Sequence, residues 1–208
     1  MDRFHRPVRM PISAFDTFEG APDPAAVNRV AHDTAHALLN GVRTSDDPDV
    51  VERTVSYANS NGLDDLVQLW APAAAHSLPG SLWRLYLVHA AVTQDPTTSS
   101  YLYRRGVEVD VSISRVVAGA VEPTGPDELL TLIEQILRGA FTGDFADALD
   151  RAAAFCAVMS QGAASIAESD EHINPARASA ALRRGARYLD FARDLSASAK
   201  LWCAGQLE

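Results

Sequence analysis

Apolar residues recur along this chain at intervals of three and four, the spacing that places them on one face of a helix. One such stripe consists of Val27, Val30, Ala31, Thr34 and Leu38. A second consists of Leu129, Leu132, Ile133, Ile136 and Leu137. The pattern predicts an all-α protein.

Proline marks where these helices begin. A capping-type residue precedes a proline at Asp23-Pro24, Asp47-Pro48, Asp95-Pro96, Gly125-Pro126 and Asn174-Pro175. Proline suits the first helical position, where its missing N–H has no intrahelical acceptor. Pro79-Gly80-Ser81 and Thr142-Gly143-Asp144 predict two further starts, and Gly41 and Asn61-Gly62 predict helix ends. We therefore expect an irregular bundle of seven or eight helices.

Residues 82–92 are apolar on almost every side of a helical projection. A helix with this pattern is buried all round. We expect a helix over residues 81–93 to be the central helix of the bundle.

Residues 106–114 fit two structures. Val107, Val109, Val111 and Ile113 alternate with polar residues, which is a strand pattern. The spacing of Val109, Ile113, Val116 and Ala120 also fits a helix. A helix is the preferred interpretation because no second strand candidate of similar quality is available for pairing.

The chain divides into three parts by composition. Residues 1–20 are expected to be an extended or disordered arm, residues 21–208 one helical domain, and residues 174–208 a basic C-terminal helix within it. We find no secretory signal and no apolar run near the roughly 20 residues of a membrane span, so we expect a cytoplasmic protein that does not bind membranes. Cys156 and Cys203 are expected to be reduced thiols in the core, because both lie within apolar helical pattern.

Charge is segregated along the chain. The whole chain has net charge −9, whereas residues 174–200 carry six cations and two carboxylates. The basic helix is therefore expected to dock on the acidic body of its own chain or of a partner, and we expect a homodimer. The negative net charge disfavours nucleic-acid binding.

His32-Asp33-Thr34-Ala35-His36 places two imidazoles one helical turn apart, a spacing that allows both to bind one metal ion. The His-Asp pair is similar to that of helical metal-dependent phosphohydrolases. The helical projection turns both histidines away from the apolar stripe, so a solvated helix face is preferred and a metal site is the alternative.

Two further clusters are candidates for ligand binding. Trp83, Arg84, Tyr86 and His89 lie on the apolar helix and suggest a pocket for a small ligand. The structural alternative is that Arg84 reaches the surface and His89 donates to a backbone carbonyl. The second cluster groups aromatic and guanidinium side chains that suit a base or an anion, although a plain surface turn has the same pattern. It consists of Tyr101, Tyr103, Arg104 and Arg105.

Residues 82–164 resemble uncharacterised all-helical proteins of high-GC actinobacteria. The resemblance is carried by Tyr103-Arg104-Arg105-Gly106-Val107 and by Gly125-Pro126-Asp127-Glu128-Leu129-Leu130. It implies a helical fold and a cytoplasmic setting, but no activity, cofactor or functional residue.

The sequence contains neither a Gly-x-Ser-x-Gly nucleophile motif nor a glycine-rich phosphate loop of standard spacing. We therefore predict a non-enzymatic helical interaction or regulatory protein without a cofactor. A metal-dependent hydrolase that uses His32, Asp33 and His36 is the first alternative. A helical pocket for a small apolar ligand is the second.

Overall fold

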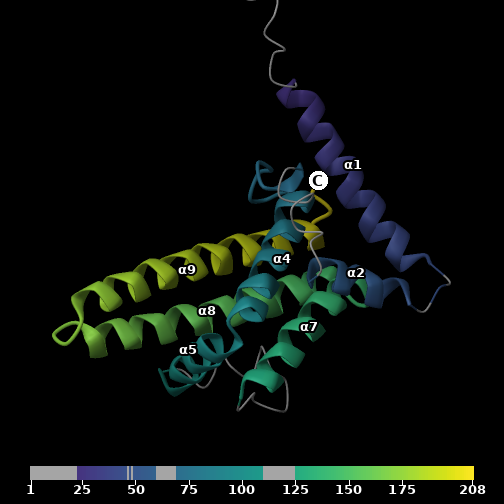
Figure 1. Cartoon of the computed structure of the whole chain (residues 1–208). Helices are drawn as coiled ribbons and strands as arrows, with labels where there is room; N and C mark the ends of the chain where they lie inside the picture. Colours follow the sequence, from purple (N-terminus) through teal and green to yellow (C-terminus); the bar gives the residue numbers. More distant parts are fainter. Residues whose placement is uncertain (1–22, 46, 48, 60–68, 110–124) are drawn as a thin grey trace, which may run out of the picture.

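The computed structural model describes residues 23–45, 47, 49–59, 69–109 and 125–208 (Figure 1). These residues form helices and no strand, so the all-α prediction is confirmed. The helices pack against one another as an irregular bundle. Their bounds are α1 Pro24–Arg43, α2 Val50–Asn59, α4 Leu78–Gln94, α5 Pro96–Val109, α7 Pro126–Thr142, α8 Phe145–Asp170 and α9 Pro175–Cys203.

The proline-marked starts are confirmed for four helices, α1, α5, α7 and α9, each of which begins at the predicted proline. Side-chain oxygens of the preceding residues bind the free amides of the first turn. Asp23 accepts from the Ala25 N–H at 3.0 Å, and Asn174 accepts from the Arg177 N–H at 3.1 Å. Asp144 caps α8 by accepting from the N–H of Ala146 at 2.7 Å.

Two predicted helix boundaries are wrong. Helix α4 begins at Leu78 and not at Ser81, because the Ser77 hydroxyl accepts from the Gly80 N–H and so caps the helix earlier. Helix α1 does not stop at Gly41 but continues to Arg43. The Arg43 guanidinium donates to the Ala140 carbonyl at 2.9 Å, and this tertiary contact supports the extra turn.

Other predictions are only partly covered by the described residues. Helix α2 begins at Val50, and Asn61-Gly62 lies outside the description, as do the arm of residues 1–20 and residues 110–124. Of the ambiguous segment 106–114, the described part belongs to α5 and is therefore helical.

Helices α8 and α9 form a long antiparallel hairpin, and α5 packs along one side of α8 (Figure 1). Glycines allow the close approach of these helices. A Cβ atom on Gly106 would lie 2.0 Å from the Val158 carbonyl oxygen. On the other side of α8, a Cβ atom on Gly185 would lie 3.1 Å from the Ala163 Cβ atom, which marks where α9 comes close to α8.

Helix α4 crosses the hairpin and contacts every other described helix (Figure 1). Eleven of its 17 residues are buried, which agrees with the prediction that it is apolar on almost all sides. Helix α8 contributes 14 buried residues, and α7 and α9 contribute seven each, so the core is shared among several helices and α4 is not singled out as its centre. Cys156 lies in this core, but Cys203 is exposed at the end of α9, so the prediction of a core position is wrong for Cys203. No helix in the described residues has both the length and the apolar character needed to cross a membrane.

Candidate interaction surface

Arg84, a predicted ligand-binding residue, is engaged within the fold. Its Nε and Nη2 atoms each lie 2.9 Å from Oδ2 of Asp194, and its Nη1 donates to the Gly80 carbonyl at 3.0 Å. The guanidinium also lies 5.8 Å from the centre of the Phe191 ring. Arg84 therefore ties α4 to α9, and its donors are directed to protein groups.

The other three members of this cluster belong to the core. Trp83, Tyr86 and His89 are all buried, and the Tyr86 ring lies 6.2 Å from the ring of Trp70. Neither ring nitrogen of His89 has a hydrogen-bond partner within the described part of the chain, so the expected bond to a backbone carbonyl is not formed. Burial lowers the pKa of His89 below its ordinary value, which keeps the imidazole neutral.

The aromatic and arginine cluster on α5 is divided between the surface and the core. Tyr103 is buried and stacks on Phe155 with ring centres 5.5 Å apart. Arg105 pairs with Glu108 at 2.6 Å and donates to the Ser165 hydroxyl at 2.8 Å. Only Tyr101 and Arg104 remain exposed, so the structure does not bring the four side chains together as one site.

His32, Asp33 and His36 lie on α1, where His36 and Asp33 are exposed and His32 is partly exposed. Their exposure agrees with the solvated helix face predicted for this segment. No group of three or more His, Cys, Asp or Glu side chains in the described residues is arranged to hold a metal ion. The histidine pair therefore has no third ligand among these residues.

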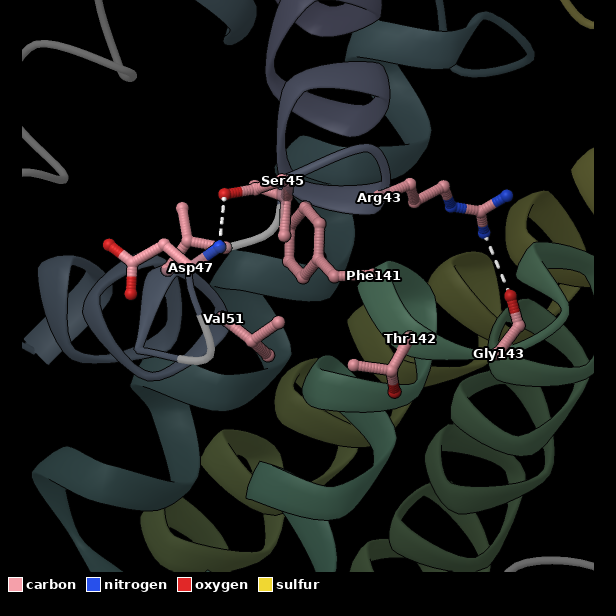
Figure 2. Close-up of a pocket in the computed structure, with 9 residues that line it drawn as sticks. Arg43, Ser45, Asp47, Val51, Phe141, Thr142 and Gly143 are labelled. Atoms are coloured by element: carbon pink, nitrogen blue, oxygen red, sulfur yellow. Dashed lines mark hydrogen bonds between the residues drawn. The ribbon is translucent and has the colours of Figure 1, made fainter.

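A pocket of about 470 Å³ opens between the end of α1, the start of α2 and the end of α7 (Figure 2). Its charged groups have protein partners. Arg43 donates to the carbonyls of Ala140 and Gly143, and Asp47 pairs with Arg53, which lowers the pKa of that carboxyl. The pocket thus offers no charged group that is free to recognise a ligand.

A different feature stands out on the α8–α9 hairpin. Leu182 and Leu189 of α9 are 56% and 39% exposed, so neither side chain is fully covered by the described chain. Successive residues of a helix are separated by roughly 100 degrees around its axis. Leu182 therefore lies about 160 degrees around α9 from Arg184, and Leu189 lies about 160 degrees from Phe191. Arg184 donates to Ser99 at the start of α5, and Phe191 meets Arg84 of α4, so the leucines face the opposite direction.

Helix α8 contributes small residues to the same side of the hairpin. Gly162 faces α5, because a Cβ atom there would lie 1.9 Å from the Leu102 carbonyl oxygen. Ser160 and Ala164 are two positions before and after Gly162, so each lies about 160 degrees from it around the α8 axis. Both therefore lie on the side of α8 that is turned away from α5. Ala164 is exposed and Ser160 is partly exposed. We call this side the outer face; it comprises Ala157, Ser160 and Ala164 of α8 and Leu182, Ala186 and Leu189 of α9.

No family model, curated protein or solved structure matches this chain. A proposal for its function therefore rests on the exposure, the apolar side chains and the charges of its surface.

The long edges of the outer face differ in charge. Asp150 and Glu168 are exposed on the α8 edge, and Arg183 and Asp190 are exposed on the α9 edge. Arg193 and Lys200, also exposed, lie within about 20 degrees of Leu182 around the α9 axis and continue the leucine stripe toward the end of that helix. Burial and the charge of Asp147 raise the pKa of Asp150, and the charge of Lys200 partly opposes this rise, so Lys200 lies near Asp150. The outer face therefore has an apolar centre with an acidic α8 edge, an α9 edge that carries Arg183, and two cations at the end of its leucine stripe.

Proposed function

We propose that this protein works by binding protein surfaces through the outer face of the α8–α9 hairpin, as an interaction or regulatory protein and not as an enzyme. The observation that carries this proposal is the exposure of Leu182 and Leu189 on one side of a 29-residue helix. Residues seven apart lie almost in line on a helix, so the two leucines form a stripe.

Physical chemistry supports a partner for such a stripe. Burying a leucine side chain contributes about 1.5 to 3 kcal/mol, and a single exposed leucine is common on protein surfaces. Here two leucines share a face with exposed Ala164 and Ala186, and charged residues border it. An apolar patch with a polar rim is typical of a protein–protein contact site.

The proposal is tested by site-specific photo-crosslinking of the full chain in cells. A benzophenone amino acid replaces Leu182 in one variant and Val30 in the control. Val30 is a matched control because it is an aliphatic residue of α1 with 50% exposure. We expect a protein adduct from position 182 and none from position 30, with the adduct identified by mass spectrometry.

Equal yields of adducts at both positions would show that the outer face has no special role. The absence of adducts at both Leu182 and Leu189 would remove the proposal altogether.

A further inference from the structure

We infer that the outer face binds a second copy of this chain, in a symmetric dimer in which α8 of each copy lies on α9 of the other. This inference rests on the proposed interaction role and names the partner. It follows from the size, the shape and the charge of the face.

The whole side of the hairpin that carries the outer face is as large as a stable dimer contact. Helix α8 has 26 residues, and at about 1.5 Å per residue it is about 39 Å long. Two adjacent helices, each about 10 Å across, give the whole side of the hairpin an area of about 800 Å² on each copy, and the outer face is its central part. Specific interfaces typically bury about 800 Å² on each partner.

The shape of the face is complementary to itself. Gly185 lies beside Ala163, at the same height along the axis of the hairpin. Because α8 and α9 are antiparallel, Leu182 is at the height of Ile166, and Leu189 is at the height of Met159. Rotation by 180 degrees about an axis parallel to the helices does not change the height of any residue along that axis. Such a two-fold axis places α9 of one copy on α8 of the other, with residues of equal height facing each other.

Under that symmetry each leucine meets small residues. Leu182 contacts the second copy near its Ala164, and Leu189 contacts it near its Ser160. A large side chain opposite small ones allows the two helices to approach closely and interdigitate, as in helix bundles. The same contacts occur twice because the arrangement is symmetric.

The charged edges select the same arrangement. Glu168 of α8 and Arg183 of α9 lie on opposite edges of one hairpin, and neither forms an ion pair within the described chain. The two-fold axis brings Glu168 beside Arg183 of the second copy at both edges. Stacking α8 on α8 would instead place acidic edge against acidic edge, which like-charge repulsion disfavours.

The first test is the molar mass of the purified full chain, measured by sedimentation over a range of concentrations. We expect a dimer for the unchanged protein and for the Val30→Asp control, and a monomer for Leu182→Asp. Circular dichroism verifies that each variant is folded. If the unchanged protein sediments as a monomer at all concentrations, the inference is overturned.

The second test is a charge exchange, which does not depend on the leucine variant folding. Glu168→Arg and Arg183→Glu should each weaken the dimer about tenfold in Kd, and combining them should restore it. Failure of the double variant to recover would rule out this arrangement. A monomeric protein that still crosslinks through Leu182 to a different protein would refute the dimer and leave the proposed function standing.

Discussion

Gly162 of α8 and Leu102 of α5 are in direct backbone contact, so close that a Cβ atom on Gly162 would lie 1.9 Å from the Leu102 carbonyl oxygen. The same hypothetical atom would lie 3.0 Å from the Gly106 nitrogen. The position of α5 on the hairpin therefore depends on the lack of a side chain at residue 162.

Gly162→Ala should consequently destabilise the protein. Because the obstacle is backbone, the helices must move apart, and we expect the free energy of unfolding to fall by about 2 to 4 kcal/mol. Urea denaturation monitored by circular dichroism measures this loss. Gly41→Ala is the control, since a Cβ atom at this helical position would meet nothing within 4 Å, and it should stabilise by about 0.5 to 1 kcal/mol.

His89 should make stability depend on pH. In the unfolded chain its pKa is about 6.5, whereas burial lowers the pKa in the folded chain. Below pH about 6.5 the unfolded state binds a proton that the folded state does not, so the free energy of unfolding falls as pH falls. The free energy of unfolding falls by at most about 1.4 kcal/mol for each pH unit. It stops falling once the pH is below the pKa of His89 in the folded chain, because both states then bind the proton.

The test compares unfolding free energies of the unchanged protein and His89→Leu between pH 7 and pH 5. The difference between the two should change with pH in the direction that favours the variant in acid. His36→Gln, on the exposed side of α1, serves as the control. A difference that stays constant over this interval would contradict the assignment of the acid sensitivity to His89.

The ion pair between Arg84 and Asp194 should be worth more than a typical surface pair. Their side chains are only 16% and 24% exposed, so little water screens the contact. Asp194→Ala leaves the guanidinium without its carboxylate, and we expect a loss of about 1.5 to 3 kcal/mol in urea denaturation. In an Arg84→Met background the same substitution should cost clearly less, because the guanidinium that Asp194 partners is already absent.

Asp190→Ala provides the matched comparison on the same helix. Asp190 lies 3.9 Å from Arg193, and both side chains are about 70% exposed. Exposed pairs of this kind contribute about 0 to 1 kcal/mol. Equal losses for the Asp190 and Asp194 variants would mean that burial does not strengthen the contact with Arg84.

Local signals in the sequence predicted the helix starts well. A side chain such as Asn174 caps a helix through a residue three positions away, so the information lies in a few neighbouring letters. The end of α1 was mispredicted for the opposite reason. Arg43 finds its acceptor at Ala140, 97 residues along the chain, and no local pattern reports that contact.

The candidate sites were harder to predict because they depend on which helices cover which faces. Arg84 was a candidate for ligand binding, but its partner Asp194 lies 110 residues away in sequence. The outer face was missed because the basic helix was considered mainly by its charge. The seven-residue spacing of Leu182 and Leu189 was a usable signal, but only the packing of α5 and α4 on the other side leaves both leucines exposed.

The order of the helices also has a consequence for synthesis. Helix α4, with its many buried residues, emerges from the ribosome before α8 and α9, against which it packs. Its apolar side chains must therefore remain without much of their native cover until the last third of the chain has been made, a period in which aggregation competes with folding. The hairpin itself needs only a short turn to close, so its formation can be rapid and can complete the core in one late step.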